Sequence, residues 1–152
     1  MKKSEYHVVS TWNFKEPFMS ACRILKSGGS SVEACLSCCR QCQELKCVES
    51  VGYGWSPNEK GETTLDAMIM NGDDMRVGCV GSLRSIKDAI GVAHDIMTKT
   101  SHSFLVGSEA TEFATRIGYK TEDLSSQDSI REYSNWSDNQ CYPNYWIVST
   151  LV

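Results

Sequence analysis

The strongest constraint on the fold of this chain is a pair of β segments joined by Asn-Gly. Residues 63–70 and 75–83 are rich in apolar side chains, and Asn71-Gly72 lies between them. Asn-Gly is a strong hairpin signal, because both residues readily take the positive φ angles that tight turns between strands require. The chain is therefore expected to contain an antiparallel β-hairpin.

Helical patterns precede and follow this hairpin. A helix is expected at 15–26, because apolar residues recur there at helical spacing and two glycines follow. Ser30 and Glu33 form a capping-box pattern for a second helix, which should continue to about residue 43. Further helices are expected at 86–99, 109–117 and 127–135, and short strands at 6–10, 51–54 and 103–106. Helices that alternate with β segments predict an α/β fold rather than a helical bundle.

Length and charge narrow the class of protein. With 152 residues and no internal repeat or linker-like run, residues 1–152 are expected to form one domain. The net charge is −4, and no block of like charge stands out, so neither nucleic acid nor an acidic membrane surface is expected as a partner. No stretch reaches the roughly 18 apolar residues that a membrane-spanning helix needs.

Two features of the sequence indicate different cellular compartments. The N-terminus lacks the apolar core of a secretory signal, which makes a cytoplasmic location possible. However, eight cysteines are many for a cytosolic enzyme, and Asn135-Trp136-Ser137 is an N-glycosylation sequon. Together the cysteines and the sequon favour an oxidising or lysosomal route.

The cysteines near the middle of the chain allow two interpretations. Cys35, Cys38, Cys39 and Cys42 form two Cys-x-x-Cys pairs, a spacing that suits zinc ligands, but no distant second pair completes a site. They also lie at i, i+3, i+4 and i+7 of the expected second helix, the pattern of a core-facing stripe. We therefore expect them to be buried as small apolar side chains and expect no metal site. A thiol-rich metal or redox module is the distant alternative.

Cys42 and Cys47 are a separate case. The four residues between them form a short turn after the expected helix, which a disulfide could close. Cys141 would need a partner elsewhere in the fold or beyond this chain.

Several segments, taken in order, carry a family resemblance. The most specific is residues 61–72, Gly-Glu-Thr-Thr-Leu-Asp-Ala-Met-Ile-Met-Asn-Gly. The others are residues 9–14, 28–34, 50–54, 86–93 and 143–146. Together they resemble the glycosylasparaginases, the aspartylglucosaminidase branch of the N-terminal-nucleophile hydrolases. The resemblance covers residues 7 to 146.

This resemblance implies a four-layer αββα sandwich, of which the chain would be the N-terminal, α-subunit-like half. In the family a precursor cleaves itself before a threonine in a His-Asp-Thr-Gly segment. The threonine hydroxyl attacks the side-chain amide of asparagine or glycosylated asparagine. Its own α-amine can serve as the base, because an α-amine has a pKa of about 7.7–8.0. No cofactor is implied. The implied partner is a β-subunit-like chain of the same precursor, in a heterotetramer or dimer, and the implied compartment is lysosomal or secretory.

The resemblance also assigns roles to individual residues. Trp12 and Phe14 match aromatic residues near the family's substrate funnel, although both could equally be core residues at a strand end. Ser50 matches a serine close to the nucleophile, or is a simple turn serine. Three residues are expected to be structural: Asp66, which should fix the local backbone, and the turn glycines Gly52 and Gly54.

Departures from the family pattern put activity in doubt. No His-Asp-Thr-Gly segment occurs, so no catalytic residue is assigned. Trp55 replaces a family glycine, which is expected to change the turn, and Val48-Glu49 replaces an Asp-Gly-like pair. Residues 147–152 are interpreted either as a final strand or as read-through from a truncated gene model. The chain is thus expected to be the inactive part of a glycosylasparaginase or L-asparaginase-like amidohydrolase; the alternative is an inactive paralogue that binds or regulates a partner.

Overall fold

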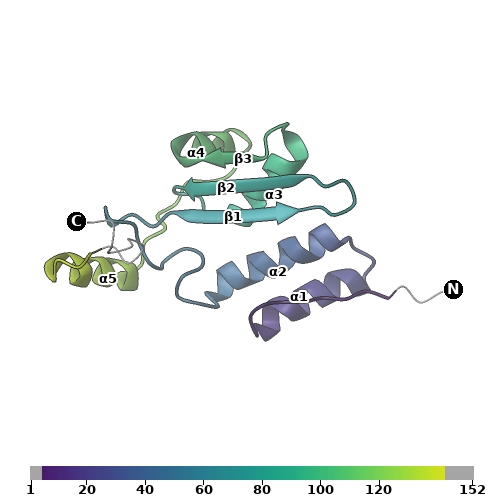
Figure 1. Ribbon diagram of the computed structural model, residues 1–152, viewed down its shortest axis with the longest axis horizontal. Coiled ribbons are helices and arrows are strands. Elements are labelled where there is room, and N and C mark those ends of the chain that lie inside the picture. Colours follow the sequence, from purple (N-terminus) through teal and green to yellow (C-terminus); the bar gives the residue numbers. More distant parts are fainter. Residues whose placement is uncertain (1–4, 143–152) are drawn as a thin grey trace, which may run out of the picture.

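The fold of residues 5–142 is described by a computed structural model (Figure 1). The expected motif at 143–146 and the segment 147–152 lie outside these residues. The elements, in chain order, are α1 (Lys15–Lys26), α2 (Ser31–Leu45), β1 (Leu65–Met70), β2 (Val77–Leu83), α3 (Ala89–Lys99), β3 (Phe104–Val106), α4 (Gly107–Arg116) and α5 (Gln127–Asp138). The predicted α/β class is therefore confirmed; the wider sandwich is an expectation for the complete protein.

The three strands form one sheet in the order β1-β2-β3. β1 and β2 pair antiparallel, which confirms the expected hairpin, and β3 pairs parallel to β2 after the α3 crossover. The Asn71 N–H donates to the Arg76 carbonyl at 2.9 Å and closes the hairpin loop. The loop is therefore longer than a two-residue turn. Within it the positive φ belongs to Met75 rather than to Gly72.

Helix α3 packs closely on one face of the sheet. A side chain at Gly78 of β2 would collide with the Ala93 carbonyl of α3, so glycine permits this close contact. The core between these elements consists of Leu65, Ile69, Val80, Leu83, Ile86, Ala89, Ile90, Val92, Ala93, Ile96, Met97, Ala110, Ala114 and Leu124. Burial of these apolar side chains is the main favourable term that holds the sheet and helices together.

The opposite face of the sheet is open in the described part of the chain. Met68 and Met70 of β1 and Phe104 and Val106 of β3 are exposed there. Figure 1 shows this sheet face with no helix in front of it. We call these four residues the open sheet face.

Helices α1 and α2 form a hairpin beside the sheet. The capping box at Ser30 is present as expected: its hydroxyl accepts the Glu33 N–H, and the Glu33 carboxylate accepts the Ser30 N–H. The prediction of a buried cysteine stripe is wrong, because Cys35 and Cys39 are exposed and Cys38 is only half-buried. Helix α2 instead turns Val32 and Leu36 toward the core and buries Ala34 and Gln43.

Two predicted strands are absent from the described residues. Residues 6–10 are an irregular, mostly exposed arm with no partner strand among residues 5–142. Residues 51–54 form turns, because Gly52 and Gly54 have φ angles of 86° and 80°, which do not occur in a strand.

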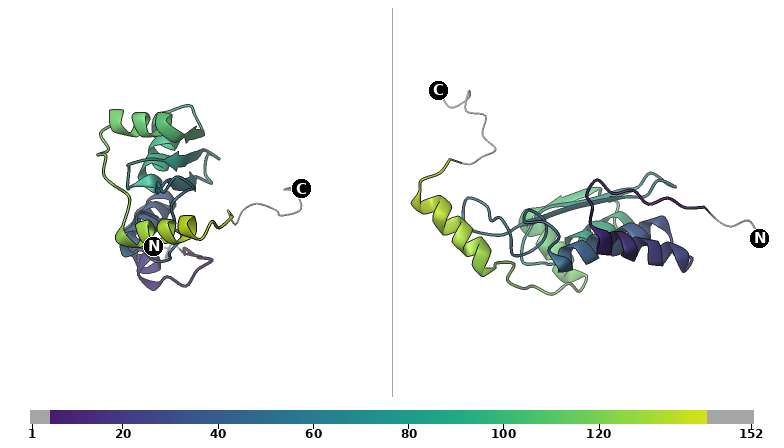
Figure 2. Two further views of the ribbon diagram at one scale, coloured as in Figure 1. Left: turned by 90° about the vertical axis from the view of Figure 1, so that its left-hand side faces the viewer. Right: turned by 90° about the horizontal axis from the view of Figure 1, so that it is seen from below.

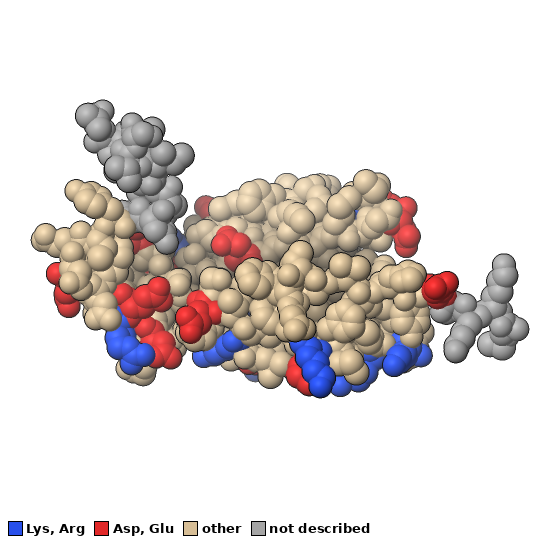
Figure 3. Space-filling model, turned by 60° about the horizontal axis from the view of Figure 1, so that its bottom comes forward, with Lys and Arg blue, Asp and Glu red and all other residues tan. Residues whose placement is uncertain are grey.

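Two surface features complete the description. None of the helices within residues 5–142 is long and apolar enough to cross a membrane. On the face shown in Figure 3, charged side chains of both signs gather along the lower rim and around one end, and the middle is largely uncharged. Figure 2 shows α5 at the end of the molecule opposite the N-terminus.

Candidate functional site

A cavity of about 150 Å³ lies between the end of α2, the glycine-rich turn and the start of β1. It brings together three of the residues that the family resemblance singles out, Ser50, Gly52 and Asp66. Its walls are formed by Gln43, Ser50, Val51, Gly52, Trp55, Ser56, Thr64, Leu65, Asp66 and Ala89. We call this the Ser50 cavity.

The glycine-rich turn is fixed to the segment that leads into α5. The Gly54 N–H donates to the Leu124 carbonyl at 2.7 Å, and the Gly54 carbonyl accepts the Ser126 hydroxyl at 2.6 Å. A Cβ atom on Gly54 would lie 2.9 Å from Lys46 Nζ and 3.2 Å from Ser126 Cβ. Gly54 is therefore required both by its positive φ and by the space around it.

Trp55 forms part of the wall of the Ser50 cavity. Its φ is not in the left-handed region, so the backbone at this position accepts a side chain. The carbonyl of Trp55 accepts the Thr63 hydroxyl at 3.1 Å, which fixes the turn against the approach to β1. The indole Nε1 is buried and has no hydrogen-bond acceptor among the described residues. The side chain of Trp55 thus takes up space in the cavity wall without demanding an unusual backbone.

Asp66 holds the neighbouring strand in place. Its Oδ1 accepts the backbone N–H of Ser82 at 2.8 Å. Ser82 has a φ of 49°, and the pairing of β1 with β2 shifts register between Leu65 and Ala67. The carboxylate therefore stabilises a bulge that alters the direction of the strand beside the cavity.

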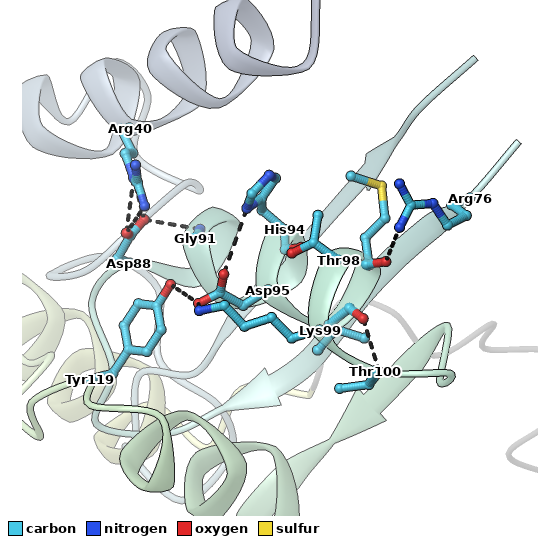
Figure 4. A network of polar contacts seen from close by, with 12 residues as sticks. Arg40, Arg76, Asp88, Gly91, His94, Asp95, Thr98, Lys99, Thr100 and Tyr119 are labelled. Carbon is cyan, nitrogen blue, oxygen red and sulfur yellow. Dashed lines mark hydrogen bonds and ion pairs between the residues drawn. The ribbon is translucent and has the colours of Figure 1, made fainter. Parts of the chain in front are cut away.

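Polar contacts hold α2 against the start of α3, beside the cavity residues Gln43 and Ala89 (Figure 4). The Asp88 carboxylate caps α3 by accepting the Gly91 N–H at 3.0 Å, and it pairs with Arg40 of α2 at 2.7 Å. Gln43, also on α2, accepts the Ile90 N–H at 3.4 Å. Gln43 thus satisfies a backbone N–H in the first turn of α3, and Arg40 balances the charge of the Asp88 carboxylate that caps this helix.

The same network continues along the outer face of α3. The Tyr119 hydroxyl donates to Asp95 at 3.1 Å, and Lys99 pairs with Asp95 at 3.0 Å. Burial and the Asp95 carboxylate raise the pKa of Tyr119, so the phenol is neutral at physiological pH. These contacts are structural and connect α3 to the segment after α4.

Trp12 and Phe14 lie outside the Ser50 cavity. Their rings are stacked with centroids 6.1 Å apart and an angle of 6° between the planes. They line a separate surface hollow of about 570 Å³ beside the start of α1. Trp12 is 63% exposed, so it is not a core residue of the described part of the chain. The structure thus does not join this aromatic pair to Ser50.

Cys42 and Cys47 are adjacent free thiols. The Cys47 N–H donates to the Cys42 carbonyl at 3.2 Å, and Lys46 between them has a left-handed φ of 49°. Burial, followed by a side-chain hydrogen bond between the Cys42 and Cys47 thiols, raises the pKa of Cys42 to about 12. The disulfide between them stays a prediction. No group of three or more His, Cys, Asp and Glu side chains within residues 5–142 is arranged to hold a metal ion.

The lining of the Ser50 cavity defines its chemistry. Hydroxyl groups of Ser50, Ser56 and Thr64 and the Asp66 carboxylate offer hydrogen bonds to a polar ligand or to a neighbouring polypeptide. Among residues 5–142, no amine or imidazole lines the cavity, and the Asp66 carboxylate there already accepts the Ser82 N–H. These residues can therefore position groups by hydrogen bonds.

Sequence reasoning missed several residues of this site. Gln43 lies among the cysteines of α2, and nothing in its spacing distinguishes it from a surface glutamine. Ser126 caps α5 and also binds Gly54, a contact between residues 72 positions apart in the chain. The start of α5 at residue 127 was predicted, but nothing local indicates that its capping serine also binds Gly54.

Comparisons with known proteins give a consistent result. A family model described as asparaginase matches residues 1–150. The N(4)-(beta-N-acetylglucosaminyl)-L-asparaginase of Rattus norvegicus is 50% identical over 139 residues, which cover 91% of this chain and 40% of the rat protein. A putative N(4)-(beta-N-acetylglucosaminyl)-L-asparaginase of Drosophila grimshawi is 46% identical over 144 residues, covering 92% of this chain and 37% of the fly protein.

A plant protein is similar over the same region. A probable isoaspartyl peptidase/L-asparaginase 3 of Arabidopsis thaliana is 44% identical over 139 residues, which cover 91% of this chain and 39% of the plant protein. The chain therefore spans about two fifths of the length of these relatives, between 37% and 40%.

Proposed function

Because this chain belongs to the asparaginase family, in which it is most clearly similar to glycosylasparaginases, we propose that it is the α-subunit-like part of an amidohydrolase. The proposed substrate is an asparagine side-chain amide, either free or carrying N-acetylglucosamine. The observation that carries the proposal is 50% identity to the rat glycosylasparaginase over 91% of the chain. The plant relative, named as an isoaspartyl peptidase/L-asparaginase, extends the proposed substrate range to isoaspartyl peptides.

In this proposal the chain positions the site, and a second polypeptide supplies the nucleophile. The 152 residues contain no His-Asp-Thr-Gly segment. The Ser50 cavity would place hydroxyl donors next to the terminal threonine of a β-subunit-like chain. The Gly54 and Asp66 contacts would keep this cavity in shape before the partner binds, which reduces the ordering cost of assembly.

The open sheet face supports the proposed partner. Exposed apolar side chains on a sheet are costly in water and are characteristic of surfaces that another element covers. A second sheet from the β-subunit-like chain would bury them and give the four-layer αββα sandwich, in a heterodimer or heterotetramer. We propose a lysosomal or secretory location on the basis of the same family assignment and the eight cysteines.

A complementation experiment tests the hydrolase proposal. The 152-residue chain is fused to the part of the rat relative that follows the matched region, and aspartate release is measured from asparagine, N-acetylglucosaminyl-asparagine and a β-aspartyl dipeptide. The fusion should release aspartate from at least one substrate, and the chain alone from none. Intact rat enzyme is the positive control. A folded fusion that hydrolyses none of the three would contradict the proposal.

The second candidate function is a catalytically inactive paralogue that binds or regulates a partner. The indole of Trp55 favours it, because this side chain occupies space in the wall of the Ser50 cavity where the family resemblance has glycine. The two candidates are separated by the fusion that carries Trp55→Gly. If this variant is active and the Trp55 fusion is inactive, the inactive paralogue is supported. Comparable rates in both fusions would exclude a blocking role for Trp55.

A further inference from the structure

A groove of about 550 Å³ runs between α5 and the loop that precedes β1. This volume lies in the range of roughly 300–1,000 Å³ that is usual for small-ligand sites. Its lining residues are Ser56, Pro57, Asn58, Glu59, Lys60, Arg84, Glu132, Tyr133, Trp136 and Tyr142. We call it the α5 groove. In Figure 1 the helix lies beside this loop, at the end of the molecule away from the N-terminus.

One wall of the α5 groove is aromatic. Tyr133 and Trp136 lie on neighbouring turns of α5, with ring centroids 6.2 Å apart and an angle of 25° between the ring planes. Both rings line the groove and give this wall an apolar surface, and their stacking leaves no slot for a further aromatic ring between them. A ligand must therefore offer an apolar face to this wall.

The other wall is polar and preformed. Asn58 Oδ1 accepts the N–H groups of Lys60 and Glu62 at 2.9 and 3.1 Å, and the Asn58 N–H donates to the Glu62 carbonyl at 2.8 Å. A Cβ atom on Gly61 would lie 3.1 Å from the Tyr133 ring, so the glycine brings this loop against the aromatic wall. Ser56 donates to Glu132 at 3.1 Å across the groove. The shape of the groove is thus set without a ligand.

The charges of the lining cancel. Glu59 and Glu132 are acidic, whereas Lys60 and Arg84 are basic, and Arg84 is also paired with Glu62 at 3.4 Å. Such a lining selects neither a strong anion nor a strong cation, but it offers many hydrogen-bond donors and acceptors. The ligand that fits is neutral and rich in hydroxyl or amide groups, and it has one apolar face.

A pyranose ring has this combination, because its axial C–H groups form an apolar face and its hydroxyl groups point from its edge. We propose that the α5 groove binds a neutral saccharide, packed against the aromatic wall of Tyr133 and Trp136 and hydrogen-bonded to the loop at 56–60. This binding does not depend on the proposed amide hydrolysis. It requires only residues that this chain contains.

The test is saturation-transfer difference NMR with the 152-residue chain and free N-acetylglucosamine, mannose and galactose, each at millimolar concentration. Sorbitol serves as a control that has hydroxyl groups but no ring face. At least one sugar should receive saturation, strongest on the C–H protons of one ring face, and sorbitol should receive none. No transfer to any sugar, or equal transfer to sorbitol, would overturn the proposal.

Three variants locate the binding. Trp136→Ala should reduce the transfer several-fold, because it removes one ring of the aromatic wall. Asn58→Ala should also reduce the transfer, because it removes a polar side chain of the opposite wall and leaves both rings in place. Phe104→Ala is the matched control, because it removes an exposed aromatic ring of the open sheet face that does not line the α5 groove. Circular dichroism checks that each variant is folded. Transfer that persists in both groove variants, or that Phe104→Ala abolishes, would place the sugar elsewhere and contradict the proposal.

Discussion

At the scale of single residues, Gly91 shows how one missing side chain can hold two helices together. A Cβ atom there would collide with Asp88 Oδ2 and lie 2.7 Å from Arg40 Nη2. The glycine therefore leaves space for the ion pair that joins α2 to the N-terminus of α3. Alanine is normally better than glycine inside a helix by about 1 kcal/mol. At this position the collision should reverse that preference.

We expect Gly91→Ala to lower the free energy of unfolding by about 1–3 kcal/mol, the usual cost of overpacking a well-packed site. Urea denaturation followed by circular dichroism measures it. Gly72→Ala is the control, because no heavy atom lies within 4 Å of a Cβ atom at that position, and it should change the free energy by less than about 0.5 kcal/mol. Equal stability of Gly91→Ala and wild type would show that the ion pair does not restrain the two helices.

At the scale of elements, α2 begins where its own sequence specifies. The Ser30 hydroxyl and the Glu33 carboxylate each satisfy a backbone N–H that the helix cannot bond internally. Ser30→Ala should therefore lower the free energy of unfolding by about 1 kcal/mol. Thermal or urea denaturation at neutral pH measures this, and Ser31→Ala, one residue later, is the matched control. A larger loss in Ser31→Ala than in Ser30→Ala would contradict the capping role.

The same capping box gives a pH prediction. Hydrogen bonds from the Ser30 backbone and hydroxyl lower the pKa of Glu33 below its ordinary value of 4.5. The native state therefore holds the carboxylate more strongly than the unfolded chain does. Its contribution is present above pH 4.5 and is lost as the pH falls through the lower pKa of the folded state. The fall in urea midpoint below pH 4.5 should be smaller in Glu33→Gln than in wild type. Glu16→Gln in α1, where no side chain caps the helix, should behave as wild type.

Elements with local signals were predicted well, and those that depend on distant partners were not. The α1 and α2 helices and the β1–β2 hairpin are specified by periodicity, a cap and a turn signal within a few residues. The arm at 6–10 has an apolar pattern, but a strand needs a neighbour, and none pairs with it among the described residues. The cysteines of α2 have the spacing of a core stripe, yet packing of Leu36 and Gln43 toward α3 decides which face is buried.

The candidate site divides in the same way. Residues 50–52 and Asp66 belong to segments that resemble one family, so their meeting in the Ser50 cavity could be anticipated from the resemblance. Trp12 and Phe14 come from a similar segment but lie in another hollow. The α5 groove could not be anticipated, because Gly61 and Tyr133 meet across 72 residues and no local pattern predicts contact between segments so far apart.

At the scale of the whole molecule, the open sheet face is the feature that most affects behaviour in solution. Met68 and Phe104 on this face are 64% and 58% exposed, and neighbouring apolar side chains surround them. An apolar sheet surface of this kind favours association, either with the proposed partner sheet or with a second copy of the chain. Burial of apolar area contributes about 25 cal/mol per Å², so even a few such side chains favour contact.

We expect the isolated 152-residue chain to self-associate at micromolar concentration, and the double variant Met68→Lys, Phe104→Lys to shift it toward monomer. Sedimentation velocity over a range of concentrations measures this. Met75→Lys is the matched control, because Met75 is 68% exposed but lies in the hairpin loop, off the sheet face. Met75→Lys adds charge but leaves the apolar side chains of the open sheet face in place, so it should change self-association little. If the chain stays monomeric, or if Met75→Lys shifts it toward monomer as much as the double variant does, the open sheet face is not the surface through which the chain associates. In the active fusion described above, the double variant should also reduce aspartate release, because charge would be buried between the two sheets.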